Sequence, residues 1–359
     1  MNTANLLVPS FADIVNVSVS ELLGAEPVTG LTLRIYATEP DYMQANPMAQ
    51  LHPGILAHAI PEKKEIGVAV ERLRQHPPNL ARESFRHEIT HIVAGILSDQ
   101  NLPIGFHEGL GQYNELSEFR GQEVRDLLTQ AKNAGKPFLS LTDLNDVRRF
   151  RRNIEIAYPQ SYAVMAFLAD AYGMEPFARF LDQLSEGRQY ELALFVAFGK
   201  RVDDLEKEWR AWLPSFLESG YKRNVLSAHD LGQGLTLLQS GRFKEAEEQF
   251  TQSEKLYRDL GRTGRAEEAA NGLLKATQAR QADEATNEAR KLLEAHDYSA
   301  SYSKATDAAS TFAKLAMADY EKRASDISLW AEKGMSGVKK LEEARAGLQS
   351  FNLPASQSA

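Results

Sequence analysis

The sequence contains no cysteine, so it can form neither a disulfide bond nor a cysteine-ligated metal site. It also lacks a long apolar run, because no stretch reaches the ~18 apolar residues that a membrane helix needs. The first ten residues carry neither a basic segment nor a long apolar one, which predicts that they are not a signal peptide. These absences leave the compartment unknown: cytoplasmic by default, extracytoplasmic if an export signal has been removed.

Basic charge is also in short supply, because 41 Lys and Arg stand against 49 Asp and Glu and give a net charge of −8. A nucleic-acid-binding surface needs a dense patch of Lys and Arg. The dense basic run at Arg148–Arg152 is short, so a solvated helix edge or a loop is the favoured interpretation. We therefore expect no nucleic-acid partner.

The composition is that of an ordinary globular protein, with 43% hydrophobic and 25% charged residues. A length of 359 residues favours two or three domains. Strand-like segments stop before Tyr221, and Ala, Glu, Lys, Gln and Leu dominate after it. The sequence therefore predicts an α+β domain over 1–220, with a small sheet followed by helices, and an all-α domain of helical hairpins over 221–359.

The most informative segment reads H-E-I-T-H over residues 87–91 and matches the H-E-x-x-H pattern of zinc hydrolases. The spacing of nearby apolar residues predicts a helix over 80–97. On a helix, residues four apart lie on one face, so His87 and His91 can reach a single metal ion. Glu88 is then placed to touch a water molecule on the metal without binding the metal itself. A surface helix that happens to carry two histidines is the alternative.

A second segment strengthens the metal interpretation. Glu108 follows His91 after 16 intervening residues, which leaves room for a turn and the start of a second helix. Together, H-E-I-T-H and E-G-L-x-x-Y resemble the gluzincin clan of zinc metallopeptidases, in its peptidase MA-like branch. The resemblance implies a zincin-like fold, a bound Zn²⁺ ion, and Glu108 as the third zinc ligand beside His87 and His91. Gly109 and Tyr113 also match the family segment.

Three short segments before the metal-binding helix are rich in strand-forming residues: 31–36, 54–60 and 65–70. A sheet followed by the zinc helix is the gluzincin order, and the resemblance extends over about residues 12–218. In that clan an edge strand borders the cleft and pairs with the substrate backbone. The resemblance implies that Gly54, Ile55 and Leu56 contact a peptide or protein substrate. His58, in the same segment, is expected to point to solvent.

A later segment, residues 158–173, resembles the gluzincin helix whose opening tyrosine faces the zinc. Carried over, that residue is Tyr158, and Tyr162 is the alternative one turn later. Either side chain could instead pack beneath the metal-binding helix. His107 directly precedes Glu108, and adjacent helix positions point apart, so substrate contact is not its favoured role.

The resemblance implies a zinc metallopeptidase that hydrolyses peptide bonds through a zinc-activated water. Glu88 would take the proton of that water and pass it to the leaving amine. Tyr158 would donate a hydrogen bond to the oxyanion that forms on the substrate. Gluzincin aminopeptidases hold the substrate's amino terminus with a G-x-M-E-N segment, which this sequence lacks. An endopeptidase is therefore favoured over an aminopeptidase.

The C-terminal region carries a different resemblance. Residues 237–246 resemble a tetratricopeptide repeat, and residues 292–298 are a weaker echo without a clean period. Arrays of helical hairpins present extended grooves that bind peptides or proteins, so a protein partner is predicted here. A plain helical bundle without a partner is the alternative. Two other functions stay open: a catalytically silent gluzincin scaffold whose tail mediates protein–protein interaction, and a zinc hydrolase acting on a non-peptide bond.

Overall fold

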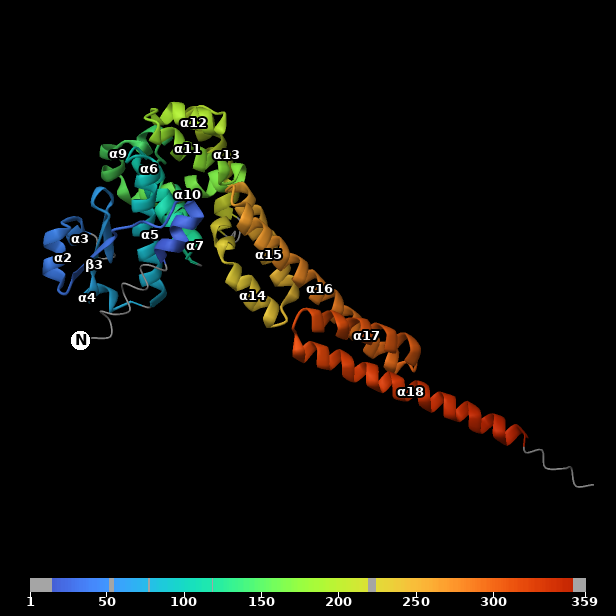
Figure 1. The fold of residues 1–359 in the computed structure, drawn as a ribbon. Helices are drawn as coiled ribbons and strands as arrows, with labels where there is room; N and C mark the ends of the chain where they lie inside the picture. The colour runs from blue at the N-terminus through green and yellow to red at the C-terminus, as the bar shows by residue number, and fades with distance from the viewer. Residues whose placement is uncertain (1–14, 52–54, 77, 118, 219–223, 351–359) are drawn as a thin grey trace, which may run out of the picture. The chain divides into compact units, whose positions relative to one another are not determined.

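The structure is a computed structural model that describes residues 15–51, 55–76, 78–117, 119–218 and 224–350 (Figure 1). The chain divides into two compact units. The first comprises Met1–His229 together with Lys255–Ala266, and the second comprises Asp230–Glu254 and Glu267–Ala359. The first unit thus takes in residues on both sides of position 221. The division into domains at 1–220 and 221–359 stays a prediction.

Three short strands form the sheet of the first unit: β1 (Thr32–Tyr36), β2 (Ala57–Ile60) and β3 (Glu65–Ala69). β3 lies in the middle, parallel to β1 and antiparallel to β2. The 3-10 turn η1 (Pro61–Lys63) joins β2 to β3, and Lys64 adopts a left-handed φ of 49° after it. The strand predicted over 54–60 is too long, because Ile55 and Leu56 precede β2. Gly54 lies outside the described residues.

The rest of the first unit is mainly helical, and a helix over residues 15–23 precedes the sheet. The other helices in this part of the chain are α2 (Glu39–Ala45), α3 (Met48–Leu51), α4 (Val70–Leu73), α5 (Pro78–Leu97), α6 (Ile104–Tyr113), α7 (Arg120–Asn133), α8 (Leu141–Asn145), α9 (Val147–Arg152), α10 (Ile154–Tyr172), α11 (Glu175–Ser185), α12 (Tyr190–Phe198), α13 (Val202–Glu218) and the 3-10 turn η2 (Val225–His229). The basic run forms α9, where exposed arginines surround the buried Phe150. Helix α10 begins one turn before Tyr158, so that residue lies inside the helix.

Helix α5 runs through the core of the first unit, as the apolar periodicity predicts. Phe85, Ile89 and Ile92 recur at three- and four-residue steps and are at most 2% exposed. The helix ends at Leu97, and Asp99 and Gln100 then adopt left-handed φ values of 47° and 61°. This turn returns the chain so that α6 packs against α5. The other side of α5 contacts β2 and η1.

Helix α6 also packs closely on α10, and a glycine makes that approach possible. A Cβ atom built on Gly109 would lie 2.4 Å from the Ser161 carbonyl oxygen and 2.9 Å from its carbon. Both obstructing atoms belong to the backbone, which cannot rotate aside as a side chain can. Glycine at position 109 therefore sets the separation of the two helices and the depth at which Glu108 sits.

We expect Gly109→Ala to destabilise the protein by about 1–3 kcal/mol, because the added methyl group overpacks the α6–α10 contact. Thermal unfolding followed by circular dichroism measures this loss. Gly337→Ala in α18 (Ala318–Ser350) is the matched control, since its Cβ would meet nothing within 4 Å. That control should gain up to about 1 kcal/mol from helix propensity. Equal melting temperatures for Gly109→Ala and the wild type would contradict the close-packing argument.

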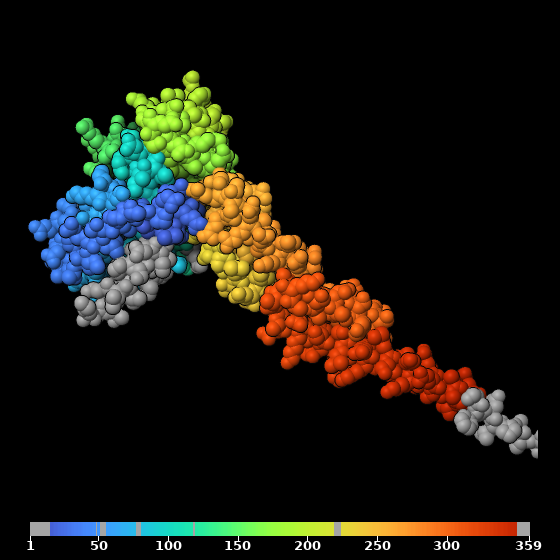
Figure 2. Space-filling view, in the orientation of Figure 1, coloured from blue at the N-terminus to red at the C-terminus, as the bar shows by residue number. Residues whose placement is uncertain are grey.

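The second unit is built from helices: α14 (Leu231–Gln239), most of α15 (Phe243–Asp259), most of α16 (Thr263–Glu294), α17 (Tyr298–Lys314) and α18. Helices α17 and α18 pack along each other, and both bury small residues such as Ala305, Ala308 and Ala324. Helix α18 continues beyond α17, where residues 336–349 are all exposed (Figures 1 and 2). The tetratricopeptide-like character and the protein partner of this region stay predictions. Among the described helices, none combines the length and apolar character needed to cross a lipid bilayer.

Candidate metal centre

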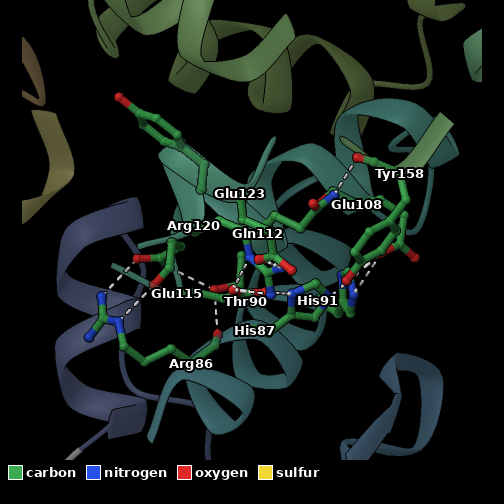
Figure 3. A network of polar contacts seen from close by, with 12 residues as sticks. Arg86, His87, Thr90, His91, Glu108, Gln112, Glu115, Arg120, Glu123 and Tyr158 are labelled. Atoms are coloured by element: carbon green, nitrogen blue, oxygen red, sulfur yellow. Dashed lines mark hydrogen bonds and ion pairs between the residues drawn. The ribbon is translucent and has the colours of Figure 1, made fainter. Parts of the chain in front are cut away.

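Three side chains from two helices converge at one point (Figure 3). His87 and His91 come from α5 and Glu108 from α6, and one ligand atom of each lies within 4.8 Å of the others. The Nε2 atoms of His87 and His91 lie 3.6 and 3.8 Å from Oε2 of Glu108. The two imidazole rings are 4.5 Å apart and nearly perpendicular, at 87°. Two imidazole nitrogens and one carboxylate form the donor set of a mononuclear zinc hydrolase.

The space between these ligands is kept open by another glycine of α6. A Cβ atom on Gly111 would lie 3.0 Å from Cε1 and Nε2 of His87 and 3.0 Å from Cε1 of His91. Any larger side chain would therefore press on both imidazoles at the edges that face Glu108. The open space beside Gly111 and the set of two imidazoles and one carboxylate together fit a small metal cation.

The charges around the two histidines also favour a cation. Burial alone would lower the pKa of His87, but the carboxylates of Glu108 and Glu115 outweigh it and raise that pKa to about 10. A metal ion in place of the proton would meet the same negative charges. For His91, burial and the neighbouring imidazoles of His107 and His87 hold the pKa well below its usual range. His91 is therefore neutral, which is the form that binds a metal.

Glu88 lies beside the three converging side chains and faces the sheet. Burial, reinforced by the charge of Glu108, raises the pKa of Glu88 to about 7 in spite of the opposing effect of His87. The backbone N–H of Ala59, in β2, faces this carboxylate and favours its charged form. A carboxyl group with a pKa near neutrality is suited to take up and release a proton. The contact also places one edge of β2 at the site.

Tyr158 and His107 lie against the two converging histidines, whereas Tyr162 does not. The ring of Tyr158 stacks beside His87 at 6.3 Å and 28°. Burial and then the charges of Glu108 raise the pKa of Tyr158 well above its ordinary value, so its hydroxyl keeps its proton. His107 packs 4.2 Å from the His91 ring, with its Nε2 3.2 Å from the His91 carbonyl oxygen. Tyr162 is only 4% exposed and belongs to the core.

The predicted substrate-contact residues have other backbone partners. The carbonyl oxygen of Leu56 accepts a hydrogen bond from the Ala69 N–H, at 2.9 Å. That of Ile55 accepts one from Arg72 Nη1, at 3.0 Å. The part of this segment that reaches the site is β2, through Ala59. Gly54 lies outside the described residues.

The expectation that His58 points to solvent is wrong. A Cβ atom on Gly67 would lie 2.2 Å from Cε1 of His58, so the edge of the imidazole fills the space above that residue of the neighbouring strand. Its Nδ1 is 3.2 Å from the Tyr42 hydroxyl oxygen. The absence of a side chain at Gly67 provides this space, and the pairing of β2 with β3 had to be known to see it.

The sequence reading missed Glu115. This residue follows Asn114, the C-cap of α6, and its Oε1 lies 2.8 Å from Nδ1 of His87 (Figure 3). A second acidic residue shortly after Glu108 was the only signal available in the sequence. The direction of the Glu115 side chain depends on the turn after α6, which sequence spacing alone does not predict.

In the structure, a helix with two histidines one turn apart meets a carboxylate from the next helix, an arrangement found in metallohydrolases. A family model for the peptidase MA superfamily matches residues 12–215. This match covers more than half of the chain, which therefore belongs to the peptidase MA superfamily. Membership indicates a metallopeptidase. Neither a curated protein nor a solved structure matches the chain.

Proposed function

We propose that the protein is a zinc-dependent metallopeptidase of the gluzincin type, acting on peptide or protein substrates and more suited to internal bonds than to the amino terminus. The observation that carries the proposal is the convergence of His87, His91 and Glu108, with Glu88 beside them. The absence of a G-x-M-E-N segment supports endopeptidase activity. The superfamily match over residues 12–215 supports a peptidase over a hydrolase of non-peptide bonds.

His87, His91 and Glu108 would hold the zinc ion, which when bound supplies Lewis-acid polarisation of the scissile carbonyl. Glu88 takes a proton from the attacking water on its carboxylate and later delivers it to the nitrogen of the leaving amine. Its pKa of about 7 allows both transfers near neutral pH. Tyr158 keeps its phenolic proton and donates a hydrogen bond to the oxyanion that develops on the substrate carbonyl oxygen.

The edge of β2 supplies a place for the substrate backbone. β2 pairs with β3 on one side, and its other edge, at Ala59, faces Glu88. An extended peptide can add to such an edge through main-chain hydrogen bonds, with little demand on its sequence. We place this contact at Ala57–Ile60, because the carbonyl groups of Ile55 and Leu56 already accept hydrogen bonds within the protein.

The proposal is tested by the metal content and the activity of the purified full-length chain. We expect about one zinc ion per chain by elemental analysis, and zinc-dependent cleavage of an unfolded protein such as reduced, alkylated casein. Cleavage should stop on treatment with a chelator and return when zinc is added. A zinc-loaded chain that cleaves no unfolded protein would instead favour the catalytically silent scaffold.

Tyr158→Phe tests the oxyanion role separately from metal binding. Loss of one such donor typically lowers kcat by about 10²–10³-fold, and we expect a reduction of that size here. Zinc content should be unchanged, because Tyr158 is not among the converging ligands. Tyr162→Phe is the matched control, since that ring packs in the core at 5.5 Å from Tyr113. An unchanged kcat in Tyr158→Phe would assign the ring to packing alone.

A further inference from the structure

The carboxylate of Glu115 occupies the outer nitrogen of one metal-site histidine. Its Oε1 lies 2.8 Å from Nδ1 of His87, and Glu115 is only 5% exposed. His87 can therefore donate its Nδ1–H to Glu115 while Nε2, 3.6 Å from Glu108, stays available as an acceptor. An imidazole held in this way has a single tautomer and a single ring orientation.

The backbone that carries Glu115 is held in place from helix α5. Arg86, which precedes His87, donates from Nε to the Asn114 carbonyl oxygen and from Nη2 to its Oδ1, both at 2.7 Å. The side-chain amide of Asn114 in turn donates to Thr90 Oγ1, at 2.7 Å. The two residues that hold Asn114 therefore lie on the same helix as His87, and Figure 3 shows Arg86, Thr90 and His87 together.

The second oxygen of Glu115 is bound from the opposite direction. Arg120 donates to Oε2 of Glu115 from Nε at 2.8 Å, and its Nη2 lies 2.7 Å from the same oxygen. The guanidinium compensates the buried negative charge of this carboxylate. Oε1 is then the oxygen that His87 uses.

The other metal-site histidine has a different arrangement. In the part of the chain that the structure describes, Nδ1 of His91 is buried and has no hydrogen-bond partner. Its ring is packed instead against His107, at 4.2 Å. Of the two histidines, His87 is therefore the one whose ring is oriented by a hydrogen bond at Nδ1.

We propose that Glu115 is a positioning residue, which holds the His87 imidazole with Nε2 directed at the metal and thereby raises zinc affinity. The proposal rests on the proposed zinc site. It differs from a purely structural role, in which Glu115 would serve the fold through its ion pair with Arg120. The two roles predict different effects of removing Arg120, because that change leaves the contact between Glu115 and His87 intact.

The experiment compares zinc affinities of full-length variants by competition with a chromophoric chelator. Glu115→Ala should weaken zinc binding by about 10–100-fold, the usual effect of losing an outer partner of a metal-binding histidine. Glu115→Gln keeps an acceptor for the Nδ1–H and should lose less. Arg120→Leu should bind zinc within about threefold of the wild type or more tightly, because the carboxylate on His87 remains. Circular dichroism establishes that each variant is folded.

The matched control is Glu65→Gln, which removes the charge of another ion-paired carboxylate in the first unit. Glu65 is 9% exposed and pairs with Arg34 at 2.7 Å. The zinc affinity of the Glu65→Gln variant should equal that of the wild type. Zinc binding by Glu115→Ala within about threefold of the wild type overturns the proposal. A loss of zinc affinity in Arg120→Leu as large as that in Glu115→Ala also overturns the proposal. A wild-type chain that takes up no zinc overturns the proposed function itself, a result distinct from either of these.

Discussion

Glu88→Gln is expected to slow hydrolysis of a protein substrate on the order of 10²–10⁴-fold and to leave the zinc content unchanged. The amide has nearly the shape of the carboxylate but cannot take a proton from water at neutral pH. Its oxygen can still face the N–H of Ala59 in β2, so the local structure should persist. Because Glu88 is not one of the three converging ligands, the metal should remain bound.

The measurement is kcat on casein together with zinc content, and both are needed. Glu123→Gln is the matched control: that carboxylate is 56% exposed, lies on α7 and contacts Arg120. It should retain wild-type rate and zinc. If Glu88→Gln cleaves at the wild-type rate, another group is the base. If it instead loses zinc, Glu88 contributes to binding the metal.

Helix α5, which carries His87 and His91, was predictable because the residues that determine it are close together in the sequence. Apolar residues at helical spacing predict α5, and the four-residue separation of His87 and His91 then places both imidazoles on one face. The approach of Glu108 to the two histidines, by contrast, depends on residues that are distant in sequence. Sixteen residues separate it from His91, and the left-handed conformations of Asp99 and Gln100 direct the chain back toward α5. The 16-residue spacing is long enough for the chain to turn back, but only the family resemblance identified Glu108 as the third ligand.

Contacts between segments that are distant in sequence could not be predicted from the sequence. The placement of Glu115 depends on two hydrogen bonds of Asn114, one accepted from Arg86 and one donated to Thr90, which lie 28 and 24 residues away in sequence. The roles of Gly109 and Gly111 appear only when α10 and the two imidazoles are in position. In a sequence both are simply glycines inside a helix, where glycine is usually unfavourable.

The boundary between the two units illustrates the same limit. Composition changes near residue 221, but Lys255–Ala266 belongs to the first unit. Within that unit, Tyr257 donates a hydrogen bond to the His229 carbonyl oxygen at 2.6 Å, and Arg265 pairs with Glu21. Deleting everything after residue 227 would remove these contacts. Loss of activity in such a truncation would therefore not separate loss of a protein-binding surface in the helical region from loss of support for the first unit.

Glu108→Ala is expected to abolish both zinc retention and hydrolysis. The variant leaves two imidazoles on one helix and removes the negative charge that lies 3.6 Å from His87 Nε2 and 3.8 Å from His91 Nε2. Loss of an outer partner of a metal ligand already costs about 10–100-fold in affinity, so loss of a direct ligand should cost at least about 10³-fold. Cleavage of casein should fall to the level of the chelator-treated wild type.

Zinc affinity by chelator competition and kcat on casein distinguish this variant from Glu88→Gln, which should keep its metal and lose only the rate. The fold should persist, because Glu108 is 24% exposed and the close contact of α6 with α10 is made by Gly109. Thermal unfolding of the metal-free proteins checks this, and the two melting temperatures should agree. Wild-type zinc affinity in Glu108→Ala would remove Glu108 from the ligand set. The third ligand would then have to come from another residue near His87 and His91, and Glu88 would be the first to test.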